Sequence, residues 1–513
     1  MDTPLVLIVG AGPTGMTMAI EAQRAGLAVR IIDKSDHTAR HSQALVVQTR
    51  TLEQLQRYGI ADIAVARGRK LTRVNFWSGR KHIMSFGFER IPSRYPYFLF
   101  LPQNETEAIL NDHMESLGIR TERGVELTSF TQREDSVRAT IRHQDGREET
   151  LEPRWTVGCG GAHSTVRKLA SIPFEGEGIP TSFFLGDMEL DGPDVPNHDL
   201  RLYFHTGGDV VFMGRLTDRL TRLIVALHSE QRRNRNQELS IRDFQDAVDR
   251  ADVRVTVRNG EWMTPFHVED LQAKRYRLQN VFLAGDAAHI HSPVGGQGMN
   301  TGIQDAANLA WKLAAAARGA DAAVVGSYEI ERAEVGKALV RFTGRGLKLA
   351  TSGNRLLEHL RDALLPLVSH PAFVQKAVLG FISETAINYR SSPISEDHGG
   401  DGSLEPGDRM PDLVIASNGH RTALLRDWSD GKYLALVINS ADPVPQEIAA
   451  LKHVKVIRLN DAELDEDGRR QLGPSPKLLL VRPDGYIGFR APLGKITGTD
   501  QELRSYAERL ALA

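Results

Sequence analysis

The sequence predicts an α/β protein in which a parallel sheet is interrupted by a β-rich segment and followed by a separate α/β domain. Two short apolar runs, at residues 5–9 and 281–284, are each followed by a glycine turn and a helical pattern. Between them the pattern becomes β-rich, and Ser391–Pro411 forms a polar boundary rich in glycine and proline. The 513 residues correspond to about three domains at roughly 100–200 residues each.

The first elements form a βαβ unit. Leu5–Val9 is apolar and rich in β-branched residues, which predicts a strand buried on both faces. Gly10–Gly15 is a turn, Met16–Ala25 reads as a helix that ends at Gly26, and Ala28–Ile32 is the next strand. A parallel sheet with a crossover helix is the expected result.

The remaining elements divide the chain into three predicted domains. Residues 1–174 and 271–390 form one discontinuous domain, which includes hairpins at 71–100 and 125–150, the strand 281–284, a helix at 302–318 and mostly helical structure over 329–390. Residues 175–270 form an inserted β-rich domain, with candidate strands at Phe183–Gly186 and Leu223–Leu227. Residues 405–513 form the last domain, with strands at 433–438, 454–459, 477–481 and 486–490 and a helix at about 500–510.

Composition excludes several classes of protein. There are 63 Lys and Arg against 65 Asp and Glu, so nothing favours binding to nucleic acid or to an anionic membrane. The single cysteine excludes an intrachain disulfide and suits a reducing cytoplasm. No basic region precedes the N-terminal apolar run, and no apolar stretch approaches the ~20 residues of a membrane span. We therefore expect a soluble, cytoplasmic protein.

Gly10-x-Gly12-x-x-Gly15 lies between a predicted strand and a predicted helix. Gly10 permits the tight turn, Gly12 lets a pyrophosphate approach the backbone, and Gly15 allows the helix to pack closely on the strand. The helix N-terminus offers N–H groups to phosphates, and Asp33 at the end of the next strand would accept hydrogen bonds from a ribose. This arrangement predicts dinucleotide binding, but it does not separate FAD from NAD.

A second motif favours FAD over NAD. Val281–Asn300 reads VFLAGDAAHIHSPVGGQGMN, so Asp286 ends a buried strand and a Gly295–Gly298 loop precedes a helix. This string resembles the ribityl-binding segment of the class A, single-component FAD-dependent aromatic hydroxylases, which are flavoprotein monooxygenases. The resemblance implies a Rossmann-like FAD-binding domain with an inserted substrate-binding domain. Because no second G-x-G-x-x-G occurs, we expect the nicotinamide donor to bind only transiently.

Two further motifs match the same family. Gln103-x-x-x-Glu107-x-x-Leu110 resembles its Q-x-x-x-E-x-x-L helix, and Arg50–Glu53 matches its R-T-L-E element. For Arg40 and Arg50 the alternative is a solvated surface charge. Together the motifs imply that noncovalent FAD is bound by Gly10, Gly12, Pro13, Thr14, Gly15, Asp33, Lys34, Arg40, Arg50, Gln103, Gly160, Asp286, Pro293, Gly296, Gly298, Met299 and Asn300, with Pro293, Gly295 and Gly296 beside the isoalloxazine.

One position departs from the family pattern. The family usually has G-A-D-G-A-x-S-x-V-R, whereas this chain has Gly158-Cys-Gly-Gly-Ala-His-Ser-Thr-Val-Arg167, with Gly160 at the aspartate position. In the family that aspartate is associated with FAD and with the nicotinamide substrate. Gly160 therefore puts the usual reduction step, and the choice between NADPH and NADH, in doubt more than the FAD fold.

The C-terminal segment Leu478–Tyr486 resembles the thioredoxin-like domain of phenol and polyketide hydroxylases. The domain contains no cysteine, so it cannot carry out thiol–disulfide exchange. Three roles remain: packing onto the FAD domain, which we favour, covering part of the active site, or forming an oligomer interface such as that of a homodimer.

The resemblance implies hydroxylation of a phenolic or polycyclic, polyketide-like aromatic compound with NADPH or NADH and O₂. In the family a flavin C4a-hydroperoxide transfers the oxygen, so no protein nucleophile is needed. Tyr203, Phe212 and Met213 are candidate substrate contacts, and the alternative is that they belong to the sheet core. His289 and His291 lie near Asp286, but the flavin role of Asp286 argues against a metal site.

Two other functions remain open at this point. A flavin dehydrogenase or oxidase would remove hydride without inserting oxygen, and Gly160 leaves room for that reaction. A flavin-binding protein without catalysis is the third hypothesis.

Overall fold

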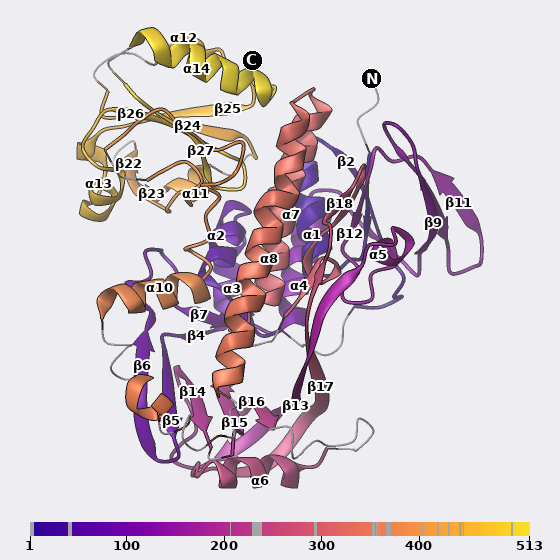
Figure 1. Ribbon diagram of the computed structural model, residues 1–513, viewed down its shortest axis with the longest axis vertical. Coiled ribbons are helices and arrows are strands. Elements are labelled where there is room, and N and C mark those ends of the chain that lie inside the picture. The colour runs from indigo at the N-terminus through magenta and orange to yellow at the C-terminus, as the bar shows by residue number, and fades with distance from the viewer. Residues whose placement is uncertain are drawn as a thin grey trace.

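The computed structural model describes residues 5–513 except 39–43, 206, 228–238, 292–294, 351–353, 355–357, 359, 366–370, 402–403, 418–419, 429–430, 441–443, 445 and 494–495. Figure 1 shows three regions, with the C-terminal domain at the upper left, a central α/β region and a β-sheet at the bottom. The long helix α8 (Ala322–Ala350) runs from the central region to the lower sheet.

A six-stranded sheet forms the centre of the molecule. Its strands, in spatial order, are β18 (Arg277–Leu278), β19 (Val281–Leu283), β12 (Trp155–Gly158), β1 (Leu5–Val9), β2 (Ala28–Asp33) and β8 (Thr121–Arg123). β1 pairs in parallel with both β2 and β12, as the βαβ pattern predicted. The helix α1 (Pro13–Arg24) packs against α7 (Gly298–Ala317) and α4 (Gln103–Ser116), and the sheet and these helices share one apolar core.

An eight-stranded sheet forms the lower region. Its order is β20 (His289–Ile290), β17 (Thr256–Ala273), β13 (Phe174–Asp191), β16 (Leu220–Leu227), β15 (Val210–Arg215), β14 (Asp199–Phe204), β5 (Arg73–Ser78) and β6 (Lys81–Gly87). β5 and β6 come from the predicted N-terminal domain, and β5 pairs in parallel with β14. The β-rich domain is therefore larger than the predicted residues 175–270, because a hairpin distant in sequence completes its sheet.

The other elements that precede the C-terminal domain are smaller. They are β3 (Val46–Val47), α2 (Thr49–Arg57), α3 (Ala61–Arg67), β4 (Arg69–Leu71), η1 (Phe88–Arg90), β7 (Phe98–Phe100), β9 (Glu126–Gln132), β10 (Val137–Arg142), β11 (Glu148–Leu151), α5 (Thr165–Leu169), α6 (Ile241–Arg250), η3 (Gly285–Ala287) and α10 (Ala372–Ile382). Asp145 and Gly146 lie in the turn that joins β10 to β11 in an antiparallel hairpin, within the predicted hairpin segment 125–150. α6 packs on one face of the eight-stranded sheet, where it closes a separate core.

The C-terminal domain contains a five-stranded sheet in the order β21 (Glu396–Asp397), β27 (Ile487–Pro492), β26 (Lys477–Val481), β24 (Tyr433–Ile438) and β25 (Val454–Leu459). Its other elements are β22 (Val414–Ser417), β23 (His420–Ala423), α11 (Leu424–Asp427), α12 (Gln446–Ala449), η4 (Asp461–Glu463), α13 (Glu466–Leu472) and α14 (Ile496–Arg509). β21 precedes the predicted start at residue 405, so the sheet uses part of the boundary segment. Trp311 of α7 belongs to the same core as this sheet, which joins the domain to the central region.

In the described part of the chain, no helix combines the length and the apolar character needed to cross a bilayer.

Candidate functional site

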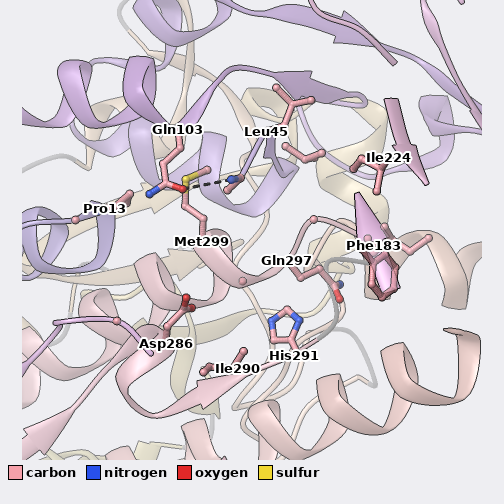
Figure 2. Close-up of a pocket in the computed structure, with 18 of the residues that line it drawn as sticks. Pro13, Leu45, Gln103, Phe183, Ile224, Asp286, Ile290, His291, Gln297 and Met299 are labelled. Atoms are coloured by element: carbon pink, nitrogen blue, oxygen red, sulfur yellow. Dashed lines mark hydrogen bonds between the residues drawn. The ribbon is translucent and has the colours of Figure 1, made fainter. Parts of the chain in front are cut away.

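A large cavity of about 790 Å³ lies between the two main sheets. One side is lined by the glycine turn after β1, the end of β2 and the turn after β19, and the other side by one face of the eight-stranded sheet. Figure 2 shows this division, with Pro13 and Asp286 on one side and Phe183 and Ile224 on the other. The first side carries the polar side chains of Asp33 and Asp286, and the second is mostly apolar apart from Arg222, so the cavity can receive two chemically different groups.

The glycine turn has the shape that its sequence predicted. Gly10 has a φ of +110°, and a Cβ there would lie 2.5 Å from the carbonyl carbon of Cys159. A Cβ on Gly15 would lie 1.9 Å from the Gly10 carbonyl oxygen, so only glycine allows the helix to pack this closely. A Cβ on Gly12 would meet nothing within 4 Å, and Gly12 lines the cavity together with Pro13 and Thr14. The N-terminus of α1 therefore faces open space large enough for phosphate groups.

Asp33 at the end of β2 connects this turn to the next loop. Its Oδ2 accepts a hydrogen bond of 2.7 Å from the Ala11 N–H, and its Oδ1 accepts one of 2.8 Å from the Ser35 N–H. Asp33 and the exposed Lys34 both line the cavity. A carboxylate accepts more than two hydrogen bonds, so Asp33 retains acceptor capacity toward a ribose hydroxyl.

Asp286 lies at the polar side of the cavity, on the η3 turn (Figure 2). Its side chain is exposed, and the space it faces is the cavity itself. The deep position in the protein raises the pKa of Asp286 above its ordinary value, and the neighbouring His289 partly opposes this effect. A carboxylate in this position is suited to accept hydrogen bonds from the hydroxyl groups of a bound ligand.

The Gly295–Gly298 loop is fixed by side-chain amides. Asn300 donates hydrogen bonds of 2.8 and 2.7 Å to the carbonyl oxygens of Val46 and Gly296, and its Oδ1 accepts one of 2.9 Å from the Gln48 N–H. Asn300 is buried and is not among the residues that line the cavity, whereas Gly295, Gly296, Gly298 and Met299 are. The structure therefore places Asn300 behind the loop, in a role of holding it.

Gln103 and Gly160 complete the polar side. Gln103 donates to Glu107 at 2.8 Å and accepts a hydrogen bond of 3.3 Å from the Ala44 N–H, so the predicted helix motif positions its own glutamine at the cavity. Gly160 also lines the cavity, and a Cβ there would be 3.7 Å from the Val9 carbonyl oxygen. This distance is an ordinary van der Waals contact.

Arg50 lies elsewhere. Its guanidinium is 2% exposed, donates at 3.0 Å to Glu53 and at 2.7 Å to the Asp484 carbonyl oxygen, and lies 5.1 Å from the centre of the Tyr486 ring. These partners belong to α2 and to the C-terminal domain, so the structure argues against the predicted FAD contact for Arg50 and also against a solvated surface charge. Arg40 and Pro293 lie outside the described residues.

The apolar side follows the alternation of strand residues. Phe212 of β15 lines the cavity, as do Leu202 and Ile224 on the neighbouring strands. Tyr203 and Met213 face the opposite side of the sheet, where they are 3% and 0% exposed in the core beneath α6. The prediction of a substrate contact is therefore corrected for these two residues, because adjacent residues of a strand point to opposite faces.

Helix α10 adds Val374, Val378 and Ile382 to the apolar side of the cavity. Their spacing of four residues places them on one face of the helix. No pattern in the strands predicted that this helix face would meet the eight-stranded sheet.

Arg167 is a further residue that motif reasoning did not place. Its guanidinium donates to the Ala287 carbonyl oxygen at 3.1 Å and to the Ala162 carbonyl oxygen at 2.7 Å, and it lies 3.8 Å from the centre of the Phe174 ring. It thereby ties the Gly160 loop to the turn that carries Asp286. The V-R pair at the end of the glycine segment was the available signal.

The residues present fit FAD. The open space at Gly12 and the helix N-terminus suit a pyrophosphate, and the Asp33 and Asp286 carboxylates suit sugar-alcohol hydroxyls. The three glycines of the Gly295–Gly298 loop let a ligand approach the backbone closely. Among the described residues, no group of three or more His, Cys, Asp or Glu could hold a metal ion.

Comparisons with known proteins agree with this geometry. Residues 3–343 match the family described as FAD binding domain, and residues 404–511 match the family described as aromatic-ring hydroxylase, C-terminal. The chain is 34% identical to 6-methylpretetramide 4-monooxygenase of Streptomyces rimosus, with 97% of this chain and 92% of that protein covered. It is 30% identical to pentachlorophenol 4-monooxygenase of Sphingobium chlorophenolicum, with 96% and 94% covered. The solved structure of anhydrotetracycline hydroxylase from Streptomyces rimosus is similar with a TM-score of 0.82 and 29% identity, and 98% of each chain is covered.

Proposed function

Because the chain belongs to the family of FAD-dependent aromatic-ring hydroxylases, we propose that it hydroxylates a polycyclic phenol of the polyketide type. The enzyme is a monooxygenase that uses FAD, with NADPH or NADH as the reductant. The observation that supports the substrate class is the apolar half of the cavity, which extends over several strands of one sheet face and along α10. A flat, fused-ring compound matches such a surface because its binding removes a large apolar area from water.

The relatives support the same substrate class. Two of the similar proteins are named for 6-methylpretetramide and anhydrotetracycline, and another is named for pentachlorophenol. The length of the apolar surface favours the larger compounds.

Polar and apolar residues of the cavity have different proposed roles. We propose that Gly12, Thr14 and Asp33 hold the adenosine and phosphate portion of FAD, and that Asp286 holds the ribityl chain. Bound FAD supplies the activation of O₂ in this family. The apolar side chains exclude water and place the ring carbon of the substrate against the Gly295–Gly296 loop.

The test is a turnover assay with a panel of simple phenols and fused-ring phenols, with NADPH and NADH compared as donors. We expect a product that gains one oxygen atom, with faster turnover on the fused-ring members. A product that loses two hydrogen atoms would instead support a dehydrogenase. Phe212→Ala should raise KM for the fused-ring substrate, because Phe212 lines the cavity. Met213→Ala should instead lower the free energy of unfolding by about 2–5 kcal/mol, because it leaves a cavity in the core.

A further inference from the structure

The turn that carries Asp286 is held by a buried carboxylate from helix α7. Asp305 Oδ2 accepts a hydrogen bond of 2.8 Å from the Gly285 N–H, and it also lies 2.8 Å from His289 Nε2. Gly285 precedes Asp286 and His289 follows it by three residues, so one carboxylate oxygen holds both ends of the turn. Asp305 and His289 are both 0% exposed, and Asp305 is not among the residues that line the cavity.

Arg332 of helix α8 holds the other oxygen of this carboxylate. Its Nε donates to Asp305 Oδ1 at 2.5 Å, and its Nη2 donates to the Thr301 carbonyl oxygen at 3.1 Å. Burial alone would raise the pKa of Asp305, but Arg332 and His289 outweigh it and hold that pKa below its ordinary value. Asp305 is therefore ionised, and each of its oxygens has a charged or strongly polar partner.

The third nitrogen of the Arg332 guanidinium, Nη1, leads to the C-terminal domain. Arg332 Nη1 donates to the hydroxyl of Tyr389 at 2.7 Å, and the Tyr389 ring lies 4.3 Å from the ring of Tyr486, centre to centre. Tyr486 lies between β26 and β27 of the C-terminal domain. A continuous path of buried contacts therefore runs from this domain to the turn at the cavity.

We infer that Asp305 and Arg332 are positioning residues for FAD, and that Tyr389 couples the C-terminal domain to cofactor binding through them. The inference rests on the proposed role of Asp286 in the FAD site. Because these side chains lie behind the cavity, they act through the direction in which the η3 turn presents Asp286. The C-terminal domain thus contributes to holding the cofactor without contacting it.

The test compares FAD release and unfolding in the purified holoenzyme. Release is followed by the rise in flavin fluorescence after dilution, and unfolding by circular dichroism during heating. Asp305→Asn replaces one carboxylate oxygen with an N–H₂ group, which cannot accept a hydrogen bond. We therefore expect FAD release to be at least about tenfold faster and, on heating, to precede unfolding. The matched control is Glu331→Gln, because Glu331 is also buried but contacts Arg482 and Lys312 instead of the turn. We expect this control to lower the unfolding temperature with an unchanged release rate at low temperature.

The outcomes separate the inference from the proposed site. Normal FAD retention in Asp286→Ala would overturn the proposed site itself. Fast release in Asp286→Ala together with normal release in Asp305→Asn would overturn the inference alone, as would equally fast release in Glu331→Gln. If Asp305→Asn does not fold, Arg332→Lys tests the same link, since it keeps the charge but loses the geometry of the guanidinium.

A pair of tyrosine variants tests the link to the C-terminal domain. Tyr389→Phe removes the hydroxyl that accepts from Arg332, whereas Tyr486→Phe removes a buried hydroxyl that has no hydrogen-bond partner among the described residues. Both variants keep the two neighbouring aromatic rings. We expect release to become about three- to tenfold faster in Tyr389→Phe and to stay unchanged in Tyr486→Phe. Equal release rates in the two variants would overturn the coupling.

Discussion

Two regions of this enzyme place charged side chains inside the molecule, and the regions differ in the partners that those side chains have. At the contact between α8 and the C-terminal domain, Arg482 donates at 2.8 Å to each oxygen of Glu331 and also pairs with Asp484. At the cavity, Asp286 faces open space. The first region is a closed network that holds two domains together, and the second leaves a carboxylate available for a ligand.

The electrostatics of the two regions follow from this difference. Burial alone would raise the pKa of Glu331, but Arg482 and Lys312 outweigh it and hold that pKa far below its ordinary value. For Asp286 burial prevails and raises the pKa. A charge with buried partners is structural, whereas a charge that lacks a close cationic partner in a cavity indicates binding.

The largest expected effect is in the closed network. Arg482→Met should lower the free energy of unfolding by about 3–5 kcal/mol, because it leaves Glu331 and Asp484 charged and buried. Urea unfolding of the holoenzyme measures this change. The control is Arg390→Ala, which removes a more exposed arginine paired with Asp408 and should cost about 0–1 kcal/mol. Equal effects of the two substitutions would contradict the distinction between a closed network and a surface ion pair.

The second effect is in the open region. Asp286→Ala should weaken FAD binding by about 1.5–3 kcal/mol, roughly 10- to 150-fold, because hydrogen bonds to a charged group are lost. The flavin content of the purified protein and a fluorescence titration measure it. Asp286→Asn keeps one acceptor oxygen and should fall between the wild type and the alanine variant. Full flavin content in Asp286→Ala would show that the open carboxylate does not serve FAD.

The sequence predicted local features better than it predicted partners. Strands β24, β25 and β26 begin and end at the predicted residues, because each is a short apolar run between turn signals. The FAD fold and the hydroxylase class are confirmed. They could be predicted because the glycine turns and the Gly285–His289 string are short, local motifs. The partner of Arg50 could not be predicted, because Asp484 is 434 residues away along the chain.

The substrate side shows a second limit. Alternation in β14 and β15 distinguishes two faces of a sheet, but it does not say which face packs on a helix and which lines a cavity. Tyr203 and Phe212 are equally apolar in pattern, yet only Phe212 lines the cavity. The helices α6 and α10 pack on opposite faces of the sheet and determine which face lines the cavity. The strand sequences do not predict where these helices pack.

The third effect concerns Glu384, a buried carboxyl near Arg332 and Asp305. Burial raises its pKa to about 8, against the opposing hydrogen bonds from Thr301 and Gln304. The folded protein therefore holds a proton that the unfolded chain has released above its ordinary pKa of 4.5. The stability contributed by this proton is complete below about pH 4.5 and is lost as the pH rises toward 8, at no more than about 1.4 kcal/mol per pH unit. Urea unfolding at a series of pH values should show a shallower fall in Glu384→Gln than in the wild type, and parallel curves would contradict this protonation.

The smallest effect is on kinetics alone. Gly160 stands where the family has an aspartate, and the structure leaves room for a side chain, since a Cβ would lie 3.7 Å from the Val9 carbonyl oxygen and 3.8 Å from the Ser164 Cα. Gly160→Asp should therefore fold and retain FAD. A new charge at the cavity should change the rate of anaerobic flavin reduction, or the ratio of the rates with NADPH and NADH, by about three- to tenfold. Gly160→Asn has nearly the same size without the charge, so a change seen in the aspartate variant and absent from the asparagine variant assigns the effect to the carboxylate. Identical reduction kinetics in Gly160→Asp and the wild type would mean that donor use in this enzyme does not depend on this position.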